Sequence, residues 1–193
     1  MIALNRAFSH LPDRFWALLS LLGTGWAVYA LIVPALWRMP RLMLAWICAA
    51  PLASLAAHAG KALVNSPRPL KVLGPDVLHT IGPPLYHWAM PSGHTITAFG
   101  TAAAIYFSLR PAGRWRWAWL FVLAFGVGCS RIAFAAHWPA DVALGAALGL
   151  LCGMSGAWLA ACIPPRHLRE QAWLMCSIDL VGLPVLYVLC SGV

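Results

Sequence analysis

Three short polar stretches interrupt an otherwise apolar chain of 193 residues, and their residue types suit chemistry on a phosphate group. They are Lys61 to Arg68-Pro69, then Pro91-Ser92-Gly93-His94, then Ser130-Arg131 through His137 to Asp141. The cations can neutralise the non-bridging oxygens of a phosphoryl group in transfer. One histidine can attack phosphorus, and the other can protonate the group that leaves.

The spacing within these stretches adds to the assignment. His137 and Asp141 lie four residues apart, so they share one face if this segment is helical. A carboxylate on one imidazole nitrogen fixes the tautomer and leaves the other nitrogen to attack. Ser92 and Gly93 are placed to open a helix, whose first backbone N–H groups bind anions.

In order and spacing, the three stretches resemble the signature of the type 2 phosphatidic acid phosphatase superfamily. That family reads Lys-x6-Arg-Pro, then Pro-Ser-Gly-His, then Ser-Arg-x5-His-x3-Asp, and this chain matches all three elements. The resemblance implies that His137 is the nucleophile that forms a phosphohistidine, that Asp141 orients it, and that His94 is the general acid. It further implies a phosphate-binding set of five residues: Lys61, Arg68, Ser92, Gly93 and Arg131. It implies no metal and no cofactor.

Composition places the chain in a membrane. It is 62% hydrophobic and only 9% charged, with a mean hydropathy of +0.77, whereas soluble domains carry about 25% charged residues. Crossing a bilayer takes about 20 mainly apolar residues. Six stretches approach this length, at 15–37, 42–63, 95–109, 117–135, 142–163 and 172–190. We therefore predict an all-α membrane protein with one domain over residues 1–193, built as a bundle of six transmembrane helices.

Basic residues in the short loops predict the orientation. One side of the bundle carries Arg38, Arg41, Arg110, Arg114, Arg116, Arg166 and Arg169. Several cations on the other side belong to the polar stretches. The positive-inside rule puts the arginine-rich side in the cytoplasm. We expect an integral protein of the plasma (inner) membrane, with the three polar stretches and both termini facing the periplasm or the outside.

Two features outside the polar stretches bear on the architecture. Leu4, Ala7, Phe8 and Leu11 share a helical face opposite Asn5, Arg6, Ser9 and His10, which predicts an N-terminal interfacial helix. Gly145, Gly149 and Gly153 recur every four residues and predict close helix packing. Packing inside the bundle is favoured, and a homodimer contact is the alternative.

Other assignments are disfavoured. The net charge of +8 comes without a stripe of basic residues, so nucleic acid is not an expected partner. The six cysteines form no Cys-x-x-Cys pair and are read as packing residues. A zinc site of His79, His87 and His94 lacks diagnostic spacing. Asp179, within the sixth span, is an intramembrane carboxylate without an assigned partner.

The expected function is hydrolysis of a headgroup phosphate from a membrane lipid, and undecaprenyl diphosphate is the first candidate because of the family resemblance. Phosphatidate, phosphatidylglycerol phosphate and lipid A phosphate are alternatives. So is a lipid-to-lipid phosphotransferase, which would pass the same phosphoryl group to another acceptor. A non-catalytic lipid-binding protein is the remote alternative, since it would not need an intact set of these residues.

Overall fold

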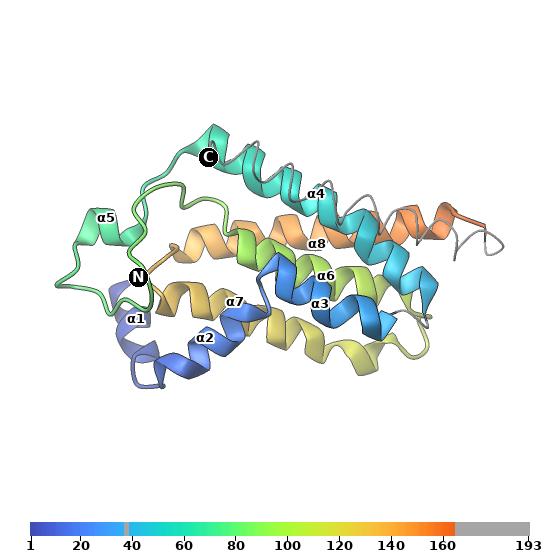
Figure 1. Ribbon diagram of the computed structural model, residues 1–193, viewed down its shortest axis with the longest axis horizontal. Coiled ribbons are helices and arrows are strands. Elements are labelled where there is room, and N and C mark those ends of the chain that lie inside the picture. The colour runs from blue at the N-terminus through green and yellow to red at the C-terminus, as the bar shows by residue number, and fades with distance from the viewer. Residues whose placement is uncertain (37–38, 165–193) are drawn as a thin grey trace.

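The computed structural model describes residues 1–36 and 39–164, and within these ranges the regular structure is entirely helical (Figure 1). The elements are α1 (Ile2–Phe8), α2 (Asp13–Leu21), α3 (Gly25–Leu36), α4 (Pro40–Val64), α5 (Pro69–Leu73), α6 (Gly93–Ser108), the 3₁₀ helix η1 (Arg114–Trp117), α7 (Trp119–Ala133) and α8 (Pro139–Cys162). The predicted sixth span at 172–190, with Asp179, lies outside the described residues.

Three helical segments of the described chain are long and apolar enough to cross a membrane. They are Pro40–Leu73, Arg114–Ala133 and Pro139–Cys162, and they contain most of the predicted spans at 42–63, 117–135 and 142–163. α6 has only 16 residues and covers the predicted span at 95–109. The described part of the chain is thus all-helical and includes helices suited to crossing a membrane.

α6 occupies the middle of the bundle, where it packs against α4, α7 and α8 (Figure 1). Glycines on α8 permit the close approach. A Cβ added at Gly145 would lie 2.8 Å from the Ser92 carbonyl oxygen, and one at Gly149 would lie 2.6 Å from that of Ile96. Gly153 meets the Gly100 carbonyl in the same way. The glycine strip therefore serves packing within this chain, as its spacing predicted.

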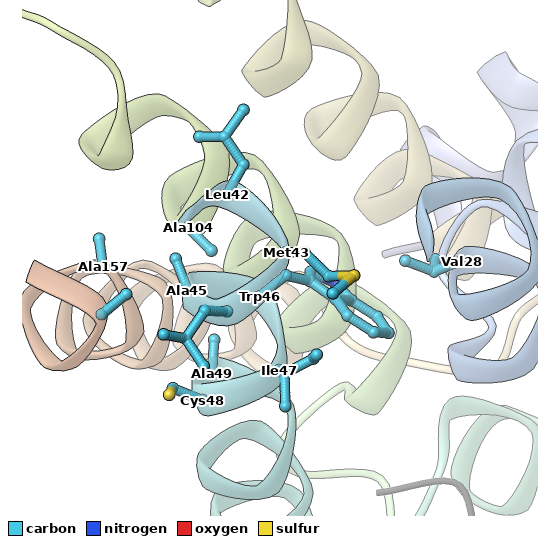
Figure 2. Close-up of a cluster of buried hydrophobic side chains, with 12 residues drawn as sticks. Val28, Leu42, Met43, Ala45, Trp46, Ile47, Cys48, Ala49, Ala104 and Ala157 are labelled. Carbon is cyan, nitrogen blue, oxygen red and sulfur yellow. The ribbon is translucent and has the colours of Figure 1, made fainter. Parts of the chain in front are cut away.

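A cluster of buried hydrophobic residues packs the N-terminal half of α4 against its neighbours. Its buried residues come mainly from α4, with Val28 of α3, Ala104 of α6 and Ala157 of α8 (Figure 2). Trp46 lies in this cluster, and its indole Nε1 donates a hydrogen bond of 2.9 Å to Thr101 Oγ1 on α6. This end of α4 is thus fixed by both packing and a polar contact.

The predicted first span, 15–37, is wrong as a single helix. The chain forms α2 and α3 instead and turns between them at residues 22–24. Gly23 and Gly25 are poor helix formers, and Gly23 is packed tightly at the turn. A Cβ there would lie 2.6 Å from Val127 Cγ1 and 2.9 Å from His94 Cβ. The break lets the chain lie directly against the predicted catalytic histidine of α6.

α1 is present, but Asn5, which the periodicity assigns to the polar face of the predicted interfacial helix, is not exposed. Asn5 is completely buried. Its Nδ2 lies 3.2 Å from Ile132 O, 3.1 Å from Ala133 O and 3.0 Å from His79 O. Its Oδ1 accepts from His79 N at 2.9 Å. A buried amide is tolerated when its polar atoms are paired. Asn5 therefore joins α1 to the end of α7 and to His79, which lies in the segment of residues 70–90 between α4 and α6 (the 70–90 segment).

Candidate active site

Every predicted site residue lies at one end of the helices that carry it. Lys61 is in the last turn of α4, Arg68 is the residue before α5, and Arg131 is in the last turn of α7. Ser92, Gly93 and His94 form the start of α6, His137 lies in the loop from α7 to α8, and Asp141 is in the first turn of α8.

Close contacts bring the three stretches together at this end. A Cβ added at Gly60, beside Lys61, would lie 2.6 Å from Pro91 Cδ, so the first stretch packs directly on the second. The Ser92 N–H donates to the Asp141 carbonyl oxygen at 3.1 Å, which joins the second stretch to the third. The indole Nε1 of Trp138 donates to Pro67 O at 3.0 Å and joins the third to the first.

His137 is buried and held through one ring nitrogen. Its Nδ1 lies 2.6 Å from the Ala89 carbonyl oxygen and 3.6 Å from Asp141 Oδ2. A carbonyl only accepts, so Nδ1 carries the proton and Nε2 has the lone pair. Burial lowers the pKa of His137, because desolvation disfavours the charged imidazole. The neutral ring is the form that can act as a nucleophile.

The predicted orienting role of Asp141 is therefore shared with a backbone carbonyl. Asp141 is almost fully buried, and its Oδ2 accepts from the Trp138 N–H at 2.8 Å. This bond caps the start of α8. Asp141 thus fixes the loop that carries His137, while the shorter contact to the ring itself comes from Ala89.

Three N–H groups of Arg68 donate hydrogen bonds to backbone carbonyl oxygens. Nε donates to His87 O at 2.6 Å, Nη1 to Ala136 O at 3.1 Å and Nη2 to Trp88 O at 3.4 Å. A guanidinium has five N–H groups, so two are left for a ligand. Arg68 therefore ties the 70–90 segment to the site and brings a positive charge to it.

Arg131 has a buried donor without a partner. Only 6% of the residue is exposed, and Nη1 donates to Ser20 Oγ at 2.7 Å. The Nε atom is buried and has no hydrogen-bond partner among the described residues. An unsatisfied buried donor costs about 1–3 kcal/mol, more when the group is charged. A phosphate oxygen would supply the missing acceptor.

A cavity of about 490 Å³ leads away from the site between α3, α4 and α6. Lys61, Gly93 and His94 line it near the reactive groups, and Tyr29 and Trp46 line it deeper in the bundle. The remaining lining is mostly alanine, glycine, serine and threonine. This is a space for an apolar molecule with a polar end.

A second cavity, of about 220 Å³, lies beneath the 70–90 segment. Arg131 and His94 line it together with Ser20 and Thr80. His94 lines both cavities. Its Nε2 is 3.5 Å from Thr24 Oγ1, which belongs to the larger cavity.

A family model for the PAP2 superfamily matches residues 41–166, which is more than half of this chain. The chain belongs to the PAP2 superfamily. Members of the PAP2 superfamily are phosphatases that act on lipid phosphates. The matched range contains all eight predicted site residues.

Individual PAP2 relatives agree with this placement. The chain is 44% identical over 72 residues to a bacitracin transport permease protein, BcrC, from Bacillus licheniformis, and 39% identical over 69 residues to a lipid A 1-phosphatase from Porphyromonas gingivalis. These matches cover 37% and 36% of this chain but only 34% and 16% of the relatives. The crystal structure of Aquifex aeolicus LpxE superposes with a TM-score of 0.67 at 28% identity, covering 80% of this chain and 92% of that one.

Three of the residues that sequence reasoning missed lie before the matched PAP2 range. Ser20 contacts Arg131, and Gly23 and Thr24 contact His94. The Gly-Thr-Gly sequence at 23–25 was the available signal, because glycines inside an apolar run mark close backbone approach. The Ala89 carbonyl had no signal, since any residue supplies that atom.

The three histidines weighed as a zinc site have separate surroundings. His79 Nε2 lies 2.8 Å from Asp13 Oδ1, and the His87 ring lies 3.3 Å from Lys71 Nζ, while His94 Nε2 lies 3.5 Å from Thr24 Oγ1. Among the described residues, no group of three or more His, Cys, Asp or Glu side chains could hold a metal ion.

Proposed function

We propose that this protein hydrolyses a terminal phosphoryl group from a membrane lipid phosphate or diphosphate, through a phosphohistidine at His137. The observation that carries the proposal is the buried donor of Arg131, which has no acceptor among the described residues and belongs to the same cluster as His137. The apolar cavity that starts at Lys61 and His94 gives the lipid portion a place beside the reactive groups.

In the first step, the lone pair of His137 Nε2 attacks phosphorus, and the bond from phosphorus to the lipid-side oxygen breaks. His94 donates a proton to that oxygen when the leaving group would otherwise be an alkoxide. Lys61, Arg68 and Arg131 offset the charge on the non-bridging oxygens. The Ser92 N–H already donates to Asp141 O, so the anion-binding N–H groups of α6 are those of Gly93 and His94.

In the second step, water attacks the phosphohistidine. His94 accepts one proton from the water, the P–N bond breaks, and its electron pair returns to His137 Nε2. Orthophosphate and the free enzyme result. The smaller cavity, which touches His94 and Arg131 beneath the 70–90 segment, is suited to admit water and release phosphate.

Undecaprenyl diphosphate is the proposed substrate, because the larger cavity is lined mainly by apolar and small residues and the site offers three cations. Phosphatidate, phosphatidylglycerol phosphate and lipid A phosphate stay as alternatives, and the relative named lipid A 1-phosphatase favours the last. A phosphotransferase would use the same first step with a lipid hydroxyl in place of water.

The test uses purified full-length protein in detergent with a panel of these lipid phosphates, and free phosphate is measured. We expect release to continue in EDTA and to stop with vanadate, which can mimic five-coordinate phosphorus bonded to His137. No release from any lipid, or release that needs an added metal, contradicts the proposal. A phosphorylated lipid acceptor without free phosphate identifies the transferase instead.

The proposed orientation has its own test. In a background without the native cysteines, Asp76→Cys should react with an impermeant thiol reagent added outside intact cells, and Gly113→Cys should react only after the membrane is opened. Both residues lie in exposed positions at opposite ends of the bundle. The reverse pattern would move the site to the cytoplasmic side.

A further inference from the structure

Ser20 is a buried polar residue at the reactive end that the proposed steps do not use. It lies in the last turn of α2, before the matched PAP2 range, and only 7% of it is exposed. Its Oγ accepts a hydrogen bond of 2.7 Å from Arg131 Nη1, a residue 111 positions farther along the chain. Ser20 therefore connects α2 to an arginine of the proposed phosphate site.

The turn after α2 fixes where Ser20 lies. Gly23 packs directly on α6 and α7, since a Cβ added to it would lie 2.9 Å from His94 Cβ and 2.6 Å from Val127 Cγ1. The Gly23 N–H donates to Ser20 O at 3.0 Å. The end of α2 is thus held against the two helices that carry His94 and Arg131, so the Ser20 hydroxyl stays beside the guanidinium.

Two contacts hold the Arg131 guanidinium and leave one of its edges uncovered. Ser20 takes Nη1, and Cζ lies 4.9 Å from the centroid of the Phe134 ring. Nη1 is on the Cδ side of a guanidinium, whereas Nη2 and Nε share the opposite edge and direct their N–H bonds in parallel. Within the described residues, Nε is buried without a partner and Nη2 makes no hydrogen bond. This pair of donors has the geometry that receives two oxygens of one phosphate.

The same residues border one cavity. Ser20, Arg131 and Phe134 line the smaller cavity together with His94. No Asp or Glu of the described chain lines it, so no carboxylate competes for the guanidinium there. An anion beside His94 would therefore supply the acceptors that the uncovered edge lacks.

We propose that Ser20 is a positioning residue for phosphoryl transfer. By holding Nη1, it directs the Nε and Nη2 edge of Arg131 at two non-bridging oxygens of the phosphoryl group. This inference rests on the proposed function and adds a segment from outside the matched family range to the site. Without the Ser20 hydroxyl, Arg131 keeps its charge, but its guanidinium can rotate and the paired donors lose their aim. Ser20 touches no reacting atom, so its whole effect passes through Arg131.

The main experiment is a double-mutant cycle between Ser20 and Arg131. kcat/KM for phosphate release is measured with the lipid phosphate that wild type hydrolyses fastest, in wild type, Ser20→Ala, Arg131→Lys and the double variant. We expect Ser20→Ala to lower the wild-type value about tenfold, the size of one hydrogen bond to a charged group. In the Arg131→Lys background it should change the value less than about twofold, because lysine keeps the charge but has no planar fork to align. Equal factors in the two backgrounds overturn the proposal.

Two conservative variants separate positioning from packing. Ser20→Thr keeps the accepting oxygen, and the added methyl group has room in the cavity that Ser20 lines, so most of the activity should remain. Ser20→Cys keeps nearly the same volume but offers only a weak acceptor, so it should resemble Ser20→Ala. This pair also tests the proposal if the alanine variant does not fold. Equal activity of the threonine and cysteine variants contradicts it.

Ser108→Ala is the matched control. Ser108 Oγ donates to Ala104 O at 2.7 Å in the last turn of α6, at the opposite end of that helix from His94, and it lines neither cavity. His87→Ala is a second control, because its side chain is exposed beside Lys71 and also lines neither cavity. Both variants should keep the wild-type kcat/KM. A tenfold loss in Ser108→Ala would show that loss of any serine hydroxyl is sufficient, which overturns the assignment.

A binding measurement that needs no turnover separates this inference from the proposed function. The melting temperature of the four proteins of the cycle, purified in detergent, is followed with added orthophosphate. We expect orthophosphate to stabilise wild type more than Ser20→Ala, and to stabilise Arg131→Lys and the double variant equally. If this pattern holds but no lipid phosphate is hydrolysed, the proposed function fails and the positioning role stands. If lipids are hydrolysed and Ser20→Ala matches wild type in both measurements, the positioning role fails alone.

Discussion

The two flanks of α6 differ in how much space they leave beside the same helix. On the α8 flank, glycines bring the backbones into contact, and this flank carries His137, in the loop before α8, and Asp141, in the first turn of α8. On the α3 flank, the chain touches His94 only at the turn around Gly23 and Thr24, and a cavity of about 490 Å³ remains between α3, α4 and α6. His94 faces this cavity from the first turn of α6.

The difference fits the proposed function. A nucleophile must be held in one orientation, because misplacement of the attacking atom lowers the rate steeply. A lipid needs volume and a route out of the membrane. α6 can meet both requirements, because α8 packs closely on one side of it and a cavity lies on the other.

The largest expected effect on turnover comes from the α8 flank, where the backbones are in contact. His137→Ala should lower the turnover of every lipid phosphate by about 10⁴-fold or more, since removing a nucleophile leaves only binding and charge stabilisation. Phosphate release is measured against His87→Ala, which should keep wild-type activity. Turnover close to wild type in a folded His137→Ala protein would exclude the phosphohistidine.

On the α3 flank, which holds the cavity, the loss of kcat/KM should depend on the leaving group. His94→Ala should lower kcat/KM for a phosphate monoester by about 10²–10⁴-fold, because an alkoxide needs a proton to leave. A diphosphate releases a phosphate monoester whose second pKa is about 6, so the loss should be far smaller. Equal losses would assign His94 to the water step or to binding.

Matched glycine substitutions test the packing difference directly. Gly149→Ala on α8 should destabilise the protein by about 1–3 kcal/mol, because the new Cβ would meet the Ile96 carbonyl and overpack the interface. Gly25→Ala on α3 has no atom within 4 Å of its new Cβ and should be neutral or slightly stabilising. Both are measured as unfolding in detergent, and similar shifts would refute the contrast.

A smaller effect should come from filling the open flank. Ala53 lines the cavity, and Ala53→Phe should lower kcat/KM for a long-chain lipid diphosphate about tenfold, through displacement of two or so methylene groups. A short water-soluble phosphate should be hydrolysed as by wild type. Leu55→Phe, at an exposed position of α4, is the control. Loss with the short substrate too would indicate damage to the site.

The sequence was most informative where chemistry restricts residue type. The eight predicted site residues lie at one end of the bundle, and the glycine spacing correctly indicated close helix packing within the bundle. Helix length was also readable for α4 and α8, where long apolar runs begin at or near proline. In each case the signal is local, because it depends on spacing within one segment.

Tertiary contacts without a local pattern could not be predicted. The break between α2 and α3 depends on Gly23 meeting Val127 and His94, residues far along the chain. Asn5 looked like a surface residue because helical periodicity does not reveal a buried amide with backbone partners. The Ala89 carbonyl that holds His137 is a main-chain atom, so no residue type announces it.

Asn5 also has a consequence for how the protein is made. Two of the carbonyl oxygens near its amide belong to Ile132 and Ala133, so α1 emerges from the ribosome long before its partners do. α1 can dock only after α4, α6 and α7 have been synthesised, because its carbonyl partners lie at the end of α7. Completion of the reactive end is therefore a late event in biogenesis, and a chain stalled before α7 would carry the first two polar stretches without a working centre.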